Sequence, residues 1–342
     1  MSLTEHTKDM KAGSASMVPE AARAAAVPGT AALMNPRVDP RGLNPSAKNP
    51  TAGKGRGQDP IRRQVQPRWR VRAALTSVLG VCMMVAACAA VKTTEQGHIG
   101  LNRTQRMSPL VSEADLNRSA EAAYAEVLSK SQSASALNVD AAMTKRVRGI
   151  ASRLIPAVEA FRPDALKWKW EVNVIQSDEL NAWCMPGGKI AFYSGIINRL
   201  KLSDDEIAAI MGHEIAHALR EHARERASEQ ATAGLLIGIG AAAAGVGQAG
   251  QDLGQLAYQT TFGLRHSRLH ETEADRIGVE LSARAGYDPR AAITLWQKMA
   301  QASGGGGTPE FLSTHPSAKT RIKDLQDYSQ RVLPLYKPGG VK

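Results

Sequence analysis

The sequence predicts an α+β domain that is mainly helical and carries a small β-sheet beside one helix with two histidines. Helical spacing of apolar residues, or helical composition, marks several long stretches between residues 112 and 302. Two short runs, 168–175 and 189–193, have strand character instead. The third observation is the sequence HEIAH at 213–217, which lies inside one of the helical stretches.

The elements ahead of the histidines follow from composition and periodicity. Residues 112–130 are rich in Ala and Glu, and residues 139–161 place Val, Ile and Leu at helical spacing, so both predict helices. Residues 168–175 alternate apolar and polar side chains, as a half-buried strand does. A second strand is predicted at 189–193, directly after a Pro-Gly-Gly turn.

That turn, formed by Pro186, Gly187 and Gly188, has two compatible interpretations. An edge strand beside a metal-bearing helix can pair with an extended peptide and lay its scissile bond over the metal. The simpler interpretation is a tight turn between two strands. We expect the turn to belong to a substrate-binding strand.

The helix that carries the histidines has a clear start. Ser203 and Glu206 have the spacing of a capping box, so the helix begins there and is predicted to run unbroken over 204–229. Apolar positions at helical spacing give it one buried face. The opposite, charged face is predicted to consist of Arg220, Glu221, Arg224 and Glu225.

The HEIAH sequence is typical of a zinc-dependent hydrolase. His213 and His217 lie four residues apart on one helix face, so both can bind a single metal ion. Glu214 can reach a water molecule on that metal and act on its proton. The alternative is a surface helix that happens to carry two histidines and an acid. Since the histidines lie near the apolar face, they need polar partners, and a metal supplies one.

A catalytic zinc usually has three protein ligands and an open position. Glu271 and Asp275 lie four residues apart on the predicted helix that starts near residue 267, so they share a face. One can bind the metal while the other hydrogen-bonds a ligand histidine. A solvated acidic face is the alternative. The neighbouring His270 points elsewhere on the helix and is expected to be structural.

Four motifs in order carry a resemblance to a known family. They are NAWCMPGG at 181–188, HEIAH at 213–217, ETEAD at 271–275 and STHP at 313–316 followed by Arg321. From about 139 to 332 the chain resembles the HtpX/BepA/LoiP-type metalloproteases, relatives of the CAAX prenyl endopeptidases. The resemblance implies a zincin-like domain with one zinc ion per chain. It implies these roles: His213, His217 and Glu271 as zinc ligands, Glu214 as general base, and Asp275 behind a ligand.

The late motif contributes two further candidates. His315 and Arg321 could stabilise the oxyanion of the transition state. In some relatives the matching histidine sits over the zinc and restrains activity, so His315 could be a switch. The alternatives are a helix-start residue for His315 and a surface charge for Arg321. The glycines at 304–307 predict a flexible break that lets the His315 segment move.

The positive charge of the chain is concentrated at its N-terminus. Residues 1–72 hold 13 Lys/Arg against 5 Asp/Glu, which is +8 of the net +11. The folded part is therefore not expected to bind nucleic acid. Residues 1–67 are poor in large apolar residues and are predicted to be a disordered extension, or to follow from a misassigned start.

Residues 68–88 resemble a bacterial lipoprotein signal. Three arginines precede an uncharged run over 73–91, and the sequence VAAC at 85–88 resembles a lipobox that ends in Cys88. Lipidated Cys88 would become the mature N-terminus, and the following Ala89 suggests outer-membrane sorting. The alternative is a transmembrane anchor, because 19 uncharged residues can just span a bilayer. Cys184 is then left without a partner and is expected to be half-buried and apolar.

We expect residues 89–111 to be a tether, 112–335 the metalloprotease domain and 336–342 a tail. The uncharged Ala/Gly-rich segment 231–250 predicts a pair of short helices or a mobile loop, with a packed helix as the alternative. The expected function is quality-control proteolysis of membrane-associated polypeptides in the periplasm, anchored to the membrane by lipid. The alternative is a chaperone-like outer-membrane assembly factor with a restrained zinc site.

Overall fold

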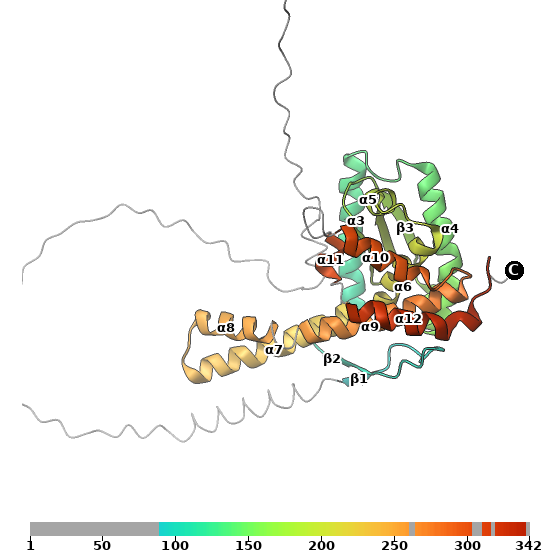
Figure 1. Cartoon of the computed structure of the whole chain (residues 1–342). Helices are drawn as coiled ribbons and strands as arrows, with labels where there is room; N and C mark the ends of the chain where they lie inside the picture. The colour runs from blue at the N-terminus through green and yellow to red at the C-terminus, as the bar shows by residue number, and fades with distance from the viewer. Residues whose placement is uncertain (1–88, 260–263, 303–309, 316–318, 340–342) are drawn as a thin grey trace, which may run out of the picture. The chain divides into compact units, whose positions relative to one another are not determined.

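The computed structural model describes residues 89–259, 264–302, 310–315 and 319–339 (Figure 1). The predicted extension, the signal segment with Cys88 and the glycines at 304–307 lie outside these ranges. The mainly helical α+β class is confirmed, with two small sheets among the described residues. Within the same ranges, no helix combines the length and the apolar character needed to cross a membrane.

Two capped helices precede the larger sheet. Helix α3 spans Glu113–Ser133 and α4 spans Ala141–Ala157; the side chains of Ser112 and Asp140 accept backbone N–H bonds at their N-termini. Two short 3-10 turns follow, Val158–Ala160 and Pro163–Lys167. Val147, Ile150 and Leu154 of α4 are buried, as their helical spacing predicts, and Ile155 is half-buried.

The sheet beside the histidine helix has three strands in the order β3-β5-β4. Strand β3, Glu171–Ile175, runs parallel to β5, Lys189–Tyr193, and β4, Ala182–Met185, pairs antiparallel with the other side of β5. Every residue of β5 is buried, as expected for a central strand. Strand β4 is therefore an edge strand, and it contacts the histidine helix.

The histidine helix, α6, spans Asp204–Leu219 and begins with the predicted capping box. The prediction of one unbroken helix over 204–229 is wrong. Glu221 adopts a left-handed conformation with φ of 52°, which ends α6, and a new helix, α7, spans His222–Ala244. The predicted charged face is also wrong, because Arg220, just before the break, and Glu225, after it, are both buried.

Helix α7 is followed by α8, Gln248–Tyr258, and the two lie side by side as a hairpin (Figure 1). Gly245, in the left-handed region with φ of 67°, ends α7. Of the interpretations for 231–250, the structure has a helix pair, with α7 much longer than a short helix.

The remaining helices complete the core. They are α5, Ser194–Arg199; α9, Leu264–Arg284; α10, Ala291–Ala302; α11, Glu310–Thr314; and α12, Lys319–Val332, which ends in the 3-10 turn Leu333–Leu335. The core lies between the sheet and helices α4, α6, α9 and α10.

Residues 89–111, predicted to be a tether, instead pack on the domain. Strands β1, Ala89–Val91, and β2, Gln105–Met107, form a two-stranded antiparallel sheet. Between them, the backbone N–H groups of His98 and Ile99 donate to the fully buried carboxylate of Glu280 on α9. No local pattern indicates these contacts, because Glu280 lies more than a hundred residues further along the chain.

Helices α6 and α9 approach each other through two glycines. A Cβ at Gly212 would lie 2.9 Å from the backbone oxygen of Gly278, and a Cβ at Gly278 would lie 2.8 Å from the backbone nitrogen of His213. Neither distance is compatible with a side chain. The missing side chains bring the backbones of the two site-bearing helices into direct contact.

We expect Gly278→Ala to lower the free energy of unfolding by about 1–3 kcal/mol, because the added methyl group must push two backbones apart. Urea unfolding measures this change. Gly149→Ala in α4 is the matched control, since its Cβ would meet no atom within 4 Å; it should stabilise the protein by roughly 0.5–1 kcal/mol. Equal stability of the two variants would contradict the close packing of α6 and α9.

Candidate metal centre and active site

Four potential metal ligands converge from three parts of the chain. His213 and His217 come from α6, Glu271 from α9, and His315 from the end of α11. One donor atom from each lies within 4.8 Å of the donors of the other three. The first three are the predicted ligands, and His315 joins them although no residue near it in sequence is a ligand.

The distances between the donor atoms fit a tetrahedral ion. Nε2 of His213 lies 3.1 Å from Nε2 of His217 and 3.2 Å from Nδ1 of His315. The carboxylate oxygens of Glu271 lie 3.0 to 3.5 Å from the three histidines. An ion with bonds of about 2.0–2.1 Å has tetrahedral edges of roughly 3.3–3.4 Å. The donors thus have the spacing of a four-coordinate metal site.

The carboxylates around His213 favour a cation at this point. Burial by itself lowers the pKa of His213, but hydrogen bonds to Asp275 and Glu271 outweigh it and raise the pKa to about 9. Burial also opposes ionisation of Glu271, yet the surrounding histidines hold the pKa of its carboxyl well below its usual range. A site that stabilises a negative charge this strongly attracts a proton or a metal ion.

Asp275 orients His213. Its Oδ1 lies 3.0 Å from Nδ1 of His213, and the pKa of Asp275 is lowered because the Arg321 guanidinium outweighs the effect of burial. An ionised Asp275 only accepts hydrogen bonds, so Nδ1 of His213 is the donor. The lone pair of Nε2 is then directed at the other ligands.

Arg321 lies behind the ligands. Its guanidinium donates to both oxygens of Asp275 at 2.7 Å, lies 3.0 Å from Glu271 and covers the ring of Trp296 at 3.8 Å. It is buried, which contradicts a surface charge, and it is not among the residues that line the neighbouring cavity. This position suits an anchor for the two carboxylates and does not suit an oxyanion donor.

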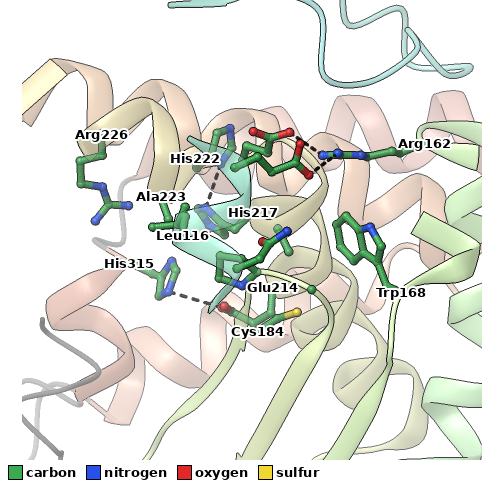
Figure 2. Close-up of a pocket in the computed structure, with 16 residues that line it drawn as sticks. Leu116, Arg162, Trp168, Cys184, Glu214, His217, His222, Ala223, Arg226 and His315 are labelled. Atoms are coloured by element: carbon green, nitrogen blue, oxygen red, sulfur yellow. Dashed lines mark hydrogen bonds and ion pairs between the residues drawn. The ribbon is translucent and has the colours of Figure 1, made fainter. Parts of the chain in front are cut away.

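Glu214 is buried on the cavity side of the ligands. Burial raises the pKa of Glu214. The nearby His315 and His213, and a hydrogen bond from the backbone of Cys184, oppose this rise in pKa. Among the described residues none donates a hydrogen bond to Oε1 of Glu214, which lies 3.4 Å from Nε2 of His315 (Figure 2). A carboxylate with a raised pKa and a free oxygen beside the metal donors can take up and release a proton.

The cavity next to Glu214 measures about 160 Å³. It is lined by Glu214, His217 and His315, by Cys184 on edge strand β4, and by Pro186 and Gly187 of the predicted turn (Figure 2). Gly188 is not part of the cavity wall and packs against Trp170: a Cβ at Gly188 would lie 2.6 Å from Cε3 of the Trp170 ring. The predicted substrate strand therefore borders the site. Cys184 is half-buried, as expected.

A buried polar layer behind His217 was missed from the sequence. Nδ1 of His217 lies 2.9 Å from Nδ1 of His222 at the start of α7, and His222 in turn reaches Glu273. On an unbroken helix, a residue five positions after His217 would point elsewhere, so the break at Glu221 hid this contact. His270 has the expected structural role: it stacks on His222 and lies 2.9 Å from Glu225.

Comparison with known proteins gives consistent relatives. A family model described as peptidase family M48 matches residues 141–329. The mitochondrial metalloendopeptidase OMA1 of Schizosaccharomyces pombe is 38% identical over 164 residues, which is 47% of this chain and 47% of that protein. The protein of the same name from Arabidopsis thaliana is 39% identical over 157 residues, covering 46% of this chain and 31% of that protein.

A bacterial relative is more distant. The beta-barrel assembly-enhancing protease of Escherichia coli K12 is 28% identical over 204 residues, covering 57% of this chain and 41% of that protein. The chain therefore spans less than half the length of each of these curated relatives. The matched region contains every residue of the metal cluster and Glu214.

Proposed function

The chain belongs to peptidase family M48, and from this premise we propose that it is a zinc-dependent endopeptidase of the bacterial cell envelope. The observation that carries the proposal is the tetrahedral spacing of His213, His217, Glu271 and His315 beside the buried Glu214. Three imidazoles and one carboxylate are a donor set that suits zinc.

Bound zinc supplies Lewis-acid polarisation of a carbonyl group and acidifies a water molecule. The residues of the chain do the rest. Glu214 accepts the proton of the attacking water and returns it to the leaving amine. Strand β4 is an edge of its sheet beside the site, and a sheet edge suits an extended polypeptide better than a folded one. Unfolded or misassembled proteins are therefore the proposed substrates.

His315 is proposed to restrain this activity. Its Nδ1 fills the fourth donor position, and its ring stacks on Phe311 at 4.6 Å. A catalytic site needs that position for water or substrate. His315 therefore has to leave before cleavage, which makes it a switch in this proposal.

The membrane location rests on the sequence around Cys88. The lipobox-like VAAC at 85–88 supports lipidation and an outer-membrane anchor. The name of the Escherichia coli relative fits an envelope role, whereas the OMA1 relatives are mitochondrial. Mass spectrometry of the mature N-terminus decides this: a diacylglyceryl group on Cys88 supports the proposal, and an unmodified chain that retains residues 1–87 would overturn it.

A second candidate function follows from the closed fourth position. A protein whose zinc site is held shut by His315 can act as a chaperone-like assembly factor. The word "assembly" in the name of the bacterial relative favours this candidate. Under it, protein partners would matter more than peptide cleavage.

The metal requirement gives the test of the main proposal. We expect the full chain to copurify with one zinc ion and to cleave an unfolded polypeptide such as reduced casein. A chelator should abolish cleavage and lower the melting temperature, because a tightly bound metal at 1,000 times its Kd stabilises the fold by about 4 kcal/mol. Zinc should restore both. Cleavage that persists in metal-free protein would contradict the proposal.

A further inference from the structure

Behind the ligand His217, a chain of hydrogen bonds leads to a buried carboxylate. Nδ1 of His217 lies 2.9 Å from Nδ1 of His222, and Nε2 of His222 lies 3.1 Å from Oε2 of Glu273 (Figure 2 shows the first contact). His222 is fully buried and Glu273 is 2% exposed. Nothing in the proposed reaction uses either group directly.

The direction of this chain is set at its carboxylate end. Oε2 of Glu273 accepts from Nε of Arg220 at 3.1 Å and from a terminal nitrogen of Arg103 at 3.0 Å. Because two guanidinium groups direct N–H donors at Oε2, this oxygen accepts hydrogen bonds. Nε2 of His222 is therefore the donor to Glu273, which leaves its Nδ1 with a lone pair.

That lone pair fixes the tautomer of the ligand. Two imidazole nitrogens 2.9 Å apart need one donor and one acceptor, and Nδ1 of His222 is the acceptor. Nδ1 of His217 consequently carries the proton, and its Nε2 keeps a lone pair facing the other metal donors. Asp275 fixes the tautomer of His213 through a direct hydrogen bond. For His217, the carboxylate of Glu273 acts through the imidazole of His222.

The orientation of His222 is held from the side as well. Its ring stacks on His270 with centroids 4.2 Å apart and planes 13° from parallel. His270 lies 2.9 Å from Glu225, and Glu225 accepts from Arg103 at 2.7 and 2.8 Å. Arg103 comes from the N-terminal segment between β1 and β2, so one guanidinium from that segment joins both carboxylates.

We propose that His222, Glu273 and Arg103 are positioning residues that set the tautomer and orientation of the metal ligand His217. This inference rests on the metal site of the proposed function. The chemistry is that of an outer hydrogen-bonding shell: groups of this kind orient a ligand imidazole and increase its basicity. The ligand they serve is a divalent cation with imidazole preference, here zinc.

The test compares zinc affinity among full-length variants by competition with a chromophoric chelator. His222→Phe keeps the ring that stacks on His270 but cannot accept from His217, so we expect zinc to bind about 10–100-fold more weakly. His222→Gln offers one acceptor and one donor in place of the imidazole nitrogens and should recover part of the loss. Arg103→Met, at a side chain that is 26% exposed, should weaken zinc in the same direction.

Glu280→Gln is the matched control. Glu280 is a buried carboxylate of the same helix, and it holds the same N-terminal segment through His98 and Ile99, but it makes no contact with the chain behind His217. We expect this variant to lose stability while its zinc affinity stays within about twofold of wild type. A general loosening of the segment would instead lower the affinity of this variant as much as that of Arg103→Met, and would overturn the inference.

A spectroscopic readout separates positioning from simple stability. In the Co²⁺-loaded protein, the visible absorption bands should shift in His222→Phe and Arg103→Met but not in Glu280→Gln. Should His222→Phe not fold, Arg103→Met and His222→Gln carry the test. If His222→Phe, His222→Gln and Arg103→Met all keep the wild-type zinc affinity and Co²⁺ bands, the inference is overturned while the proposed function stands. A wild-type protein that binds no zinc would overturn the metal site of the proposed function instead.

Discussion

Glu214→Gln is expected to lower the rate of polypeptide cleavage by about 10²–10⁴-fold while zinc remains bound. The amide has the shape of the carboxylate but cannot accept and return a proton. Glu214 is not one of the four clustered donors, so metal binding does not depend on it. Cleavage of an unfolded polypeptide and metal analysis of the same preparation measure the two effects separately.

The matched control for this variant is Glu113→Gln. Glu113 is a carboxylate on the wall of the same cavity, and it is paired with Arg162 at 2.9 Å, away from the metal donors. Its activity should stay within about twofold of wild type. Wild-type cleavage by Glu214→Gln would sink the proposed mechanism. Full rescue of a deletion strain by a cleavage-dead Glu214→Gln protein would favour the chaperone-like assembly factor over the protease.

His315→Ala is expected to raise the cleavage rate by roughly tenfold or more. If the closed arrangement makes up about nine-tenths or more of the molecules, removing it raises the competent fraction about tenfold or more. The same variant should bind zinc more weakly, because one of four clustered donors is lost. Steady-state cleavage of an unfolded polypeptide at saturating zinc measures the first effect, and chelator competition measures the second.

His98→Ala serves as the control, since His98 is an exposed histidine outside the cluster. A decrease of about 10²-fold for His315→Ala would instead identify His315 as an oxyanion donor. That outcome would contradict the proposed switch and leave the metal site intact. A purely structural role for His315 predicts neither the faster cleavage nor the weaker zinc binding.

Local patterns sufficed for most of the fold. The capping box at Ser203, the helical spacing in α4 and the turn before β5 each depend on neighbours within a few residues, and the structure has them where they were predicted. The spacing of His213 and His217 depends on a single helical turn, so their convergence could be predicted too. Glu271 and Asp275 needed the family resemblance to be singled out.

The failures share one physical cause. Glu221, where α6 ends, pairs with Arg162, 59 residues away, and residues 89–111 are held by Glu280, which accepts from His98. A local sequence pattern places charged residues such as Arg220 on the surface. Only the folded chain shows that Arg220 is buried beside Glu273. Because buried ion pairs have no periodic signature, residues such as Arg220 and Glu225 were predicted to be exposed.

With the proposed lipid on Cys88, the seating of the N-terminal segment would also limit how far the enzyme can reach. Thr94 is already fixed in the domain, because its hydroxyl accepts from Arg220 at 3.0 Å. Thr94 lies only six positions after Cys88, and a fully extended chain covers at most about 3.3–3.6 Å per residue. A lipid on Cys88 would thus hold the domain within about 20 Å of the bilayer. Polypeptides stalled at the membrane surface would be within range, and those diffusing deep in the aqueous compartment would have to come to the membrane to be cleaved.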